Sequence, residues 1–378
     1  MKNLKRSLSL IMMCMVLILV SCNNEKEVGK PQDQPKMTET TESTETTTTE
    51  AKEDKEIKEV SENSKTIYPL EITTYDQNGD EITTTYEKAP EKVLAVYQGS
   101  IETLLALGQA DRIVAAAGLD NEVDESMKAD FEKLNYLEAF TPPKEDVTIL
   151  NPDMILSWGS YFGEKTLGNP SDWIEKGTNI YINSNTRRGG YPRTVDNELT
   201  DILNLGKIFD VQDKAQKIVD ETKAVIDTTI EKTKGQTPSN VMVLEPINGK
   251  ITNYDKDSIA GDMVTKLGGK LANPDAKEVG AEDIVASNPD VIFVVYMAYS
   301  GENGEDVAKT QMDLINNNEA LQSVEAIKNK RVYPIMLGDM YASGVRTKNG
   351  IENFAKGLYP ELDLSLIHIS EPTRLLSI

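Results

Sequence analysis

The sequence predicts an α/β protein with two lobes, each built on a mostly parallel sheet and joined to the other by one long rigid helix. Short apolar runs alternate with helical stretches on both sides of a long helical region. Strands that are separated by helices form βα units on parallel sheets. A sequence pattern also occurs once in each half of the chain, as expected for two related lobes.

The strands of the first half are short and apolar or alternating. Alternation over residues 72–75 and 82–86, with Asn78-Gly79 between them, predicts a β-hairpin. A helix is expected from Ile101 to Leu107, where Gly108 stops it. Further strands of this half are expected at 93–97, 113–117, 154–157 and 180–182.

The least interrupted helical region covers residues 194–234 and contains no proline, with one break near Gly206 and Asp210. Its second part, 212–235, is the expected connecting helix, because its apolar residues recur at helical spacing until Pro238 follows. The expected lobes are therefore residues 66–211 and 236–363. In the second lobe the alternation resumes with strands at 241–244, 291–296 and 332–335 and a helix near 258–267.

The repeated pattern joins a short helix to a strand through a proline. EDVTILNPDMI, from Glu145 to Ile155, matches EDIVASNPDVI, from Glu282 to Ile292, at an offset of 282 − 145 = 137 residues. In each copy the proline ends the helix, because it cannot continue it, and an apolar strand follows. Chance similarity between two helix–proline–strand units is the alternative interpretation.

The N-terminal residues have the order of a secretory signal. Positive charges come first, an apolar run over 8–20 follows, and the run closes on Ser21-Cys22. This end resembles a bacterial lipobox, so we expect residues 1–21 to be a signal peptide and Cys22 to carry lipid; an ordinary signal with a coincidental cysteine is the alternative. The Thr, Glu and Lys of residues 22–65 predict a disordered tether, because they offer little apolar surface to bury.

Several classes of function are disfavoured by composition. The chain has two cysteines, Cys14 and Cys22, so the mature part offers no disulfide, cysteine metal site or cysteine nucleophile. The single histidine, His368, falls within LSLIHISEPTR, which resembles a translated sequencing adapter, and we expect residues 364–378 to be artefactual; a genuine polar tail is the alternative. Without usable histidine, neither a bare transition-metal site nor a Ser-His-Asp triad is expected. A net charge of −22 disfavours nucleic acid as a partner.

Three segments resemble the solute-binding proteins for ferric siderophores, haem and vitamin B12. They are Ala89–Leu94, Glu102–Gly108 followed by Asp111–Val114, and both copies of the repeat, in one order along about residues 67–363. The resemblance implies a cleft between two lobes that closes modestly on its ligand, delivery to an ABC permease, and no enzymatic activity or cofactor. It predicts a monomeric lipoprotein on the extracytoplasmic face of the cell membrane.

The resemblance also implies that a glutamate on each lobe docks with permease arginines. By position these are Glu145 and Glu282. Two matched carboxylates would fix the orientation of a complex more than its affinity. The alternative is that each is a helix-start carboxylate favoured by the helix dipole.

Residues directly after strands are the candidate ligand contacts, because ligands of open α/β sheets lie at the carboxyl ends of strands. Aromatic faces there suit a flat organic chelate, and arginine forks suit an anionic one. Core packing and a solvated basic loop are the alternatives. The predicted ligand-binding residues are Tyr97, Trp158, Tyr161, Arg187, Arg188, Arg193, Tyr296, Tyr299, Met340 and Arg346. The wider set of strand-end candidates adds Gln98, Leu119, Asp120, Phe162, Glu245, Tyr254, Met297 and the rest of residues 183–193 and 336–346.

The predicted function is therefore import of a ferric siderophore or a similar metal chelate. Cobalamin and haem remain alternatives in the same fold. A sensor or adhesion lipoprotein without a transport role is the alternative from another class.

Overall fold

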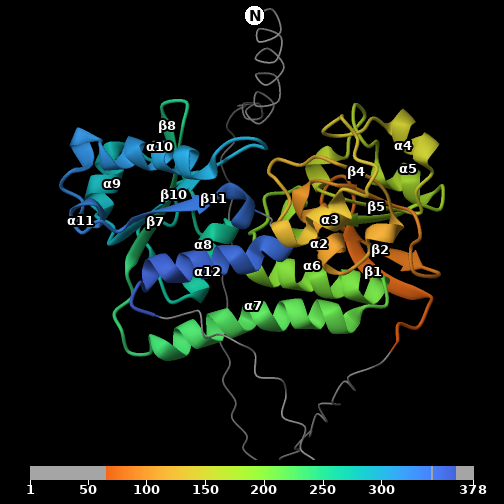
Figure 1. Ribbon diagram of the computed structural model, residues 1–378, viewed down its shortest axis with the longest axis horizontal. Coiled ribbons are helices and arrows are strands. Elements are labelled where there is room, and N and C mark those ends of the chain that lie inside the picture. Colours follow the sequence, from red (N-terminus) through yellow and green to blue (C-terminus); the bar gives the residue numbers. More distant parts are fainter. Residues whose placement is uncertain (1–64, 342–343, 363–378) are drawn as a thin grey trace, which may run out of the picture. The chain divides into compact units, whose positions relative to one another are not determined.

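The computed structural model describes residues 65–341 and 344–362 (Figure 1). The predicted signal peptide, Cys22, nearly all of the predicted tether and the predicted artefactual tail lie outside the described residues. Among the described residues, no helix is both long and apolar enough to cross a membrane.

The first lobe combines a hairpin with a fully parallel sheet. In the hairpin, β1 (Leu70–Tyr75) pairs antiparallel with β2 (Glu81–Tyr86), and the Asp76 carboxylate accepts the backbone N–H groups of the turn, from Asn78 to Asp80. The parallel sheet has the order β4-β3-β5-β6. Its strands are β3 (Val93–Val96), β4 (Ile113–Ala117), β5 (Met154–Ser157) and β6 (Asn179–Ile182). The helices of this lobe are α2 (Gln98–Ala106), α3 (Lys128–Phe131), α4 (Lys144–Leu150), α5 (Pro170–Ile174) and α6 (Val195–Ile208).

The second lobe has a mixed sheet that is mostly parallel, as predicted. Its order is β11-β10-β7-β8, with β9 also pairing β7, and only β8 runs antiparallel to its neighbour. The strands are β7 (Asn240–Ile247), β8 (Lys250–Asn253), β9 (Lys270–Leu271), β10 (Val291–Tyr296) and β11 (Val332–Met336). The helices are α8 (Ile259–Lys266), α9 (Ala281–Ser287), α10 (Gly304–Asn316), α11 (Glu325–Lys328) and α12 (Thr347–Leu358).

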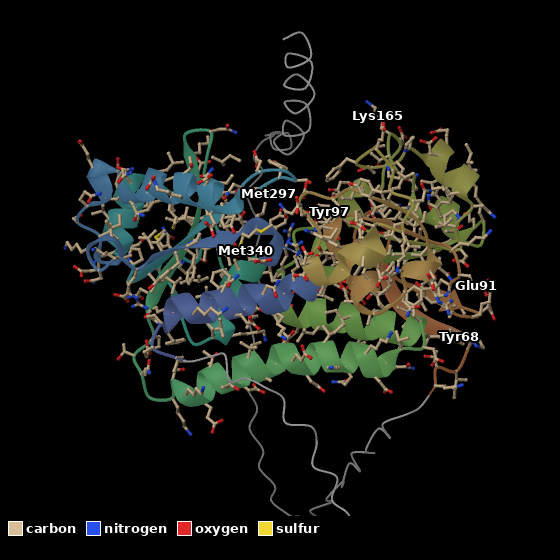
Figure 2. The ribbon with its side chains drawn as sticks, in the orientation of Figure 1. Tyr68, Glu91, Tyr97, Lys165, Met297 and Met340 are labelled. Carbon is tan, nitrogen blue, oxygen red and sulfur yellow. The ribbon has the colours of Figure 1, made fainter. Side chains whose placement is uncertain are left out.

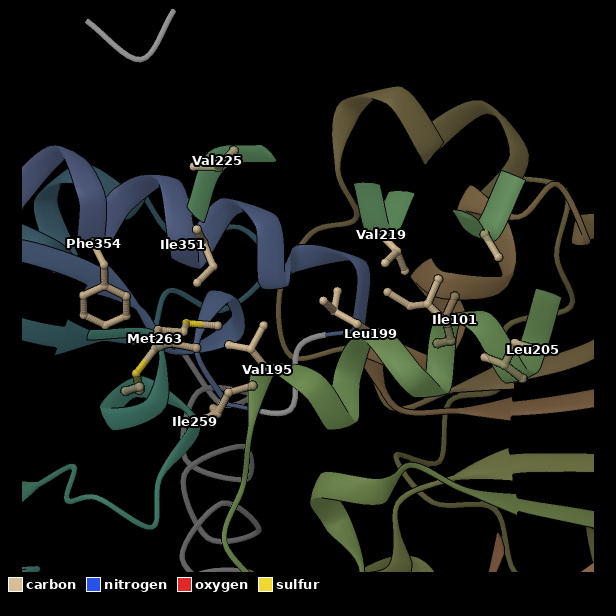
Figure 3. Packing of buried hydrophobic residues seen from close by; sticks show 14 of the residues in the cluster. Ile101, Val195, Leu199, Leu205, Val219, Val225, Ile259, Met263, Ile351 and Phe354 are labelled. Atoms are coloured by element: carbon tan, nitrogen blue, oxygen red, sulfur yellow. The ribbon is translucent and has the colours of Figure 1, made fainter. Parts of the chain in front are cut away.

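One long helix joins the two lobes, and this prediction is confirmed. Helix α6 ends at Ile208 and α7 (Gln212–Lys232) begins after a turn in which Asp210 has a left-handed backbone, φ 56°. Helix α7 packs against α6 of the first lobe and α12 of the second (Figure 1). One buried apolar cluster runs through all three helices, and Figure 3 shows Leu199, Val219 and Ile351 within it. The lobes therefore share a core.

The repeated pattern forms the same structure twice. Helices α4 and α9 both end at an asparagine with a left-handed backbone, Asn151 at φ 48° and Asn288 at φ 38°. The carboxylate of the aspartate two residues later accepts backbone N–H groups at the start of a neighbouring strand. Asp153 accepts the N–H groups of Glu91 and Lys92 just before β3, at 2.8 and 2.9 Å, and Asp290 accepts that of Asn240 at the start of β7, at 2.7 Å.

A short segment of the second lobe lies against the first. The 3₁₀ turn η7 (Gly344–Arg346) packs on α2 and α6. Gly344 has φ 56°, and a Cβ at this position would meet the side chain of Thr103 and the Gly99 carbonyl. Glycine is therefore required here by both its backbone conformation and its surroundings.

Helix α6 carries two buried carboxylates, and one of them, Glu198, bonds the η7 turn. Glu198 is 1% exposed and accepts the Gly344 N–H at 2.7 Å and the Asn185 side-chain amide at 2.6 Å. Asp201 is 3% exposed and accepts hydrogen bonds from Tyr181 and Ser184. Burial raises the pKa of Glu198 to about 7, with the Asp201 charge adding to it, and burial raises the pKa of Asp201 to about 6.

These shifts predict a fall in stability as the pH rises through mildly acidic values. Above pH 4.5 an unfolded glutamate has lost its proton, whereas folded Glu198 retains its proton until about pH 7. The unfolded chain then binds fewer protons, so the free energy of unfolding decreases between these values. Replacing Glu198→Gln should reduce that decrease by roughly 1 to 3 kcal/mol. Urea unfolding at several pH values measures it.

Exposed Glu305→Gln on α10 is the matched control, and it should leave the decrease unchanged. An undiminished decrease in Glu198→Gln would show that this carboxyl group is ionised throughout the range.

Candidate ligand-binding site

The strand order of each sheet marks one place where a ligand site is expected. Strand β3 has β4 on one side and β5 on the other, so the chain crosses from one side of β3 to the other between β4 and β5. Strand β7 likewise lies between β10 and the β8 and β9 strands. In open α/β sheets, ligands bind outside the carboxyl ends of strands at such switch points.

Aromatic side chains of both lobes meet at these carboxyl ends. The interlobe aromatic cluster consists of Tyr97, Phe140, Trp158 and Tyr161 from the first lobe and Tyr254 and Tyr341 from the second. Tyr97 and Trp158, which directly follow β3 and β5, have ring centroids 3.7 Å apart, and Tyr161 stacks on Trp158 at 6.0 Å. Trp158 lies 5.9 Å from Tyr341, which lies 6.4 Å from Tyr254. Phe140 packs edge-on against Tyr97 and Tyr161.

Tyr97 is held in an unusual backbone conformation within this cluster. Its φ is 83°, a region that non-glycine residues seldom occupy, and its N–H donates to the Ala117 carbonyl at 2.8 Å. Such strain persists where the surrounding structure imposes it, and it is concentrated at functional sites. Burial raises the pKa of both Tyr97 and Asp120, and the charge of Asp120 raises the pKa of Tyr97 further. In Figure 2, Tyr97 and Met297 lie on the facing edges of the two lobes.

Three polar groups lie at the cluster: the Trp158 indole nitrogen, the Arg193 guanidinium and the Glu245 carboxyl group. The indole nitrogen of Trp158 is buried and has no hydrogen-bond partner among the described residues. The Arg193 guanidinium lies 4.2 Å above the Tyr341 ring and, within the described part of the chain, forms no ion pair. Glu245 accepts the Tyr254 hydroxyl at 2.8 Å, and burial raises its pKa. The cluster therefore offers a hydrogen-bond donor and a positive charge.

The three predicted arginines of residues 187–193 have different contacts. Arg187 lies between the rings of Tyr75 and Tyr191, at 4.8 and 3.8 Å. Arg188 donates to the Phe162 carbonyl at 2.8 Å. Of these predicted arginines, the structure brings Arg193 to the aromatic cluster and engages the other two elsewhere.

Arg346 and Met340 differ from their predicted environments. The Arg346 guanidinium binds both oxygens of Glu102, at 2.6 and 2.7 Å, and its side chain is 9% exposed. The fork expected to face a ligand is therefore occupied by a carboxylate from the other lobe. Met340 is 0% exposed within the shared core, so it presents no surface to a ligand in this structure.

The two remaining tyrosines lie at the end of β10. Tyr296 is the last residue of the strand, and Tyr299 is 50% exposed three residues later. Burial raises the pKa of Tyr299, and the charges of Asp120, Glu302 and Glu245 add to the rise. Sequence reasoning missed Phe140, because it follows no strand, and the site role of Glu102, which is a buried charge within the apolar run of α2.

The two glutamates of the repeat are on the surface. Glu145 is in the first turn of α4 and Glu282 in the first turn of α9, and both are exposed. Exposed apolar side chains accompany them on the same helices, Ile149 at 82% and Val285 at 37%. No group of three potential His, Cys, Asp or Glu metal ligands occurs among the described residues.

Known proteins resemble this fold over most of its length. The family model for periplasmic binding proteins matches residues 93–336, which is more than half of the chain. No match was found among curated proteins.

Three solved structures illustrate the similarity. A periplasmic binding protein from Veillonella parvula DSM 2008 is 30% identical, with a TM-score of 0.72, over 78% of this chain and 93% of that one. An ABC-type Fe³⁺-hydroxamate transport system protein from Saccharomonospora viridis DSM 43017 is 20% identical, with a TM-score of 0.60, over 77% and 99%. The haem-binding protein RhuT from Roseiflexus sp. RS-1 is 16% identical, with a TM-score of 0.55, over 71% and 98%.

The α/β fold with two lobes that the sequence predicts is thus confirmed. This chain belongs to the periplasmic binding protein family, so it is an extracytoplasmic substrate-binding protein rather than an enzyme.

Proposed function

We propose that the protein binds a ferric siderophore or a similar anionic iron chelate at the interlobe aromatic cluster and delivers it to an ABC permease. The observation that carries this proposal is the presence of aromatic faces, Arg193 and the unpartnered Trp158 indole N–H in one place. Aromatic faces pack against the organic shell of a chelate. The guanidinium and the N–H group suit its oxygen atoms.

The proposed contacts are a subset of those predicted from the sequence. Tyr97, Trp158 and Tyr161 belong to the cluster, and Arg193 lies over the ring of its Tyr341. The name of the Saccharomonospora viridis neighbour includes Fe³⁺-hydroxamate, which supports this class of ligand.

Haem is the second candidate, and the cluster tyrosines favour it. A tyrosine phenolate can serve as an axial ligand to haem iron. Tyr97, Tyr161, Tyr254 and Tyr341 lie within one aromatic group, and one neighbour is named as haem-binding. Cobalamin remains a ligand to be compared with both.

The ligand is identified by titrating the fluorescence of Trp158. The chain has two tryptophans, so Trp173→Phe leaves Trp158 as the reporter. Ferric catecholates, ferric hydroxamates and ferric citrate should quench it, whereas free Fe³⁺, Zn²⁺ and Mn²⁺ should not. Arg193→Met should weaken binding by roughly 1.5 to 3 kcal/mol, because a charged hydrogen bond is lost.

Arg188→Met is the control for this titration and should bind like the parent, since Arg188 contacts Phe162 instead. Equal losses in both arginine variants would contradict the assignment of Arg193. Binding of haem or cobalamin alone would replace the siderophore as ligand, and binding of a bare metal alone would remove the chelate proposal.

Permease docking is proposed to require Glu145 and Glu282. Reversing both to Arg should abolish uptake while ligand affinity stays unchanged, because both carboxylates are on the surface, outside the aromatic cluster. Uptake of the ligand is measured in cells that lack the native protein and produce the variant. Ligand affinity is measured by fluorescence titration. The matched control reverses Asp146 and Asp283, the next residue of each helix. Normal uptake with the double glutamate reversal would leave these residues as helix-start carboxylates only.

Membrane attachment is proposed to depend on lipid at Cys22. Cys22→Ala should shift the protein from the membrane fraction to the medium, or leave an uncut precursor, because the acyl chains provide the membrane affinity. Immunoblots of separated fractions measure this. Processed Cys22→Ala that stays on membranes at the parent level would refute the anchor.

A further inference from the structure

We propose that Glu102 and Arg346 form a buried interlobe pin that positions the loop of residues 120–124, and through it the aromatic cluster. In this role Arg346 is a positioning residue for the ligand site and not a ligand contact. The step from the pin to ligand affinity rests on the proposed function. The pin itself is a property of the ligand-free protein.

The two side chains form a bidentate ion pair away from solvent. Arg346 Nε donates to Glu102 Oε2 at 2.6 Å, and Nη2 donates to Oε1 at 2.7 Å. The side chains are 9% and 0% exposed. The residues are 244 positions apart in the chain, Glu102 on α2 of the first lobe and Arg346 at the start of α12 of the second.

The pair holds the 120–124 loop at several points. Arg346 Nη2 also donates to the Glu122 carbonyl at 2.8 Å, and Glu102 accepts the Asp124 N–H at 3.3 Å. Glu102 further accepts the side-chain amide of Gln98 at 2.8 Å. The side-chain oxygen of Gln98, Oε1, accepts the backbone N–H groups of Asp120 and Asn121, at 3.2 and 3.1 Å. The loop's backbone is therefore anchored to the pin and to its neighbour Gln98.

The same loop reaches the ligand site and the second lobe. Ala117, three residues before the loop, accepts the N–H of Tyr97 in the aromatic cluster at 2.8 Å, and the charge of Asp120 adds to the rise in the pKa of Tyr97. The Asn121 side-chain amide donates to the Ala298 carbonyl and lies 3.7 Å from the Met297 sulfur. Figure 2 shows Tyr97, Met297 and Met340 close to the boundary between the lobes.

Arg346 also lies five residues after Tyr341 of the aromatic cluster. It ends η7, where Gly344 donates to Glu198 of the first lobe at 2.7 Å. Tyr341 precedes this turn and packs against Trp158. Releasing Arg346 would therefore loosen both the 120–124 loop and the second-lobe face of the aromatic cluster.

An apolar pair of similar size would hold the lobes together at least as strongly, because two ions lose their hydration on burial. What the ion pair adds is direction. A guanidinium and a carboxylate meet in one planar, bidentate arrangement, and the remaining donor is aimed at a single carbonyl. This geometry suits an ion pair that positions the backbone of the 120–124 loop.

The experiment uses the ligand-free protein with Trp158 as the reporter, in a Trp173→Phe background. The double variant Glu102→Gln with Arg346→Met removes both charges of the pair, so that neither partner stays buried as an ion without the other. We expect it to fold, with acrylamide quenching of Trp158 increased about twofold and hydrogen exchange of residues 120–124 accelerated by about tenfold.

The matched control is Glu221→Gln with Lys348→Met. That ion pair joins α7 to α12 at 2.7 Å, two residues after Arg346, and is about one third exposed. It does not contact the 120–124 loop, so both readouts should remain at the parent level.

Parent-level quenching and exchange in a folded double variant would overturn the pin. Equal changes in the control pair would also overturn it, since they would indicate general loosening of α12. If the double variant does not fold, the single variant Arg346→Lys tests the proposal instead. It keeps the positive charge but cannot form the bidentate hydrogen bonds of the guanidinium. Faster exchange in residues 120–124 supports the pin in that case, and unchanged exchange overturns it. A protein that passes this test and binds no chelate would retain the pin while losing the proposed function.

Discussion

The apolar core shared by the two lobes is the constraint on which the rest of the structure depends. Helix α7 packs against α6 and α12, and one buried cluster includes Ile101 of the first lobe, Val219 of α7 and Phe354 of the second lobe (Figure 3). Separating the lobes along these helices would expose apolar surface to water. This exposure costs free energy of about 25 cal/mol for each Å² of apolar surface. The carboxyl edges of the two sheets are consequently held in one relation, and side chains that follow different strands can form a single site.

Most of the architecture was predictable, because it depends on local patterns. Alternation and apolar runs located the strands, and the absence of proline located α6 and α7, with the break at Asp210. The repeat predicted α4 and β5 in one lobe and α9 and β10 in the other. The strand-end rule also identified Tyr97 and Trp158, because parallel strands bring their carboxyl ends to one edge.

The directions of long charged side chains were not predictable in the same way. Arg346 meets Glu102 across 244 residues, and Arg187 lies between Tyr75 and Tyr191, so each partner is chosen by the folded structure. Met340 follows β11 like a site residue but turns into the core. Phe140 joins the cluster from a loop with no strand before it. Position relative to a strand predicts a neighbourhood, and packing decides which side chains face it.

The electrostatics of the cluster connect the fold to the ligand. In so acidic a protein, Arg346 is paired with a carboxylate, whereas Arg193 rests on the Tyr341 ring and has no ion pair in the described part of the chain. Glu198 exerts a charge interaction with Arg193, but its oxygens are committed to Asn185 and Gly344. A partly desolvated cation without a hydrogen-bonded anion has lost hydration that nothing yet replaces. The anionic chelate that we propose as the ligand would restore those interactions.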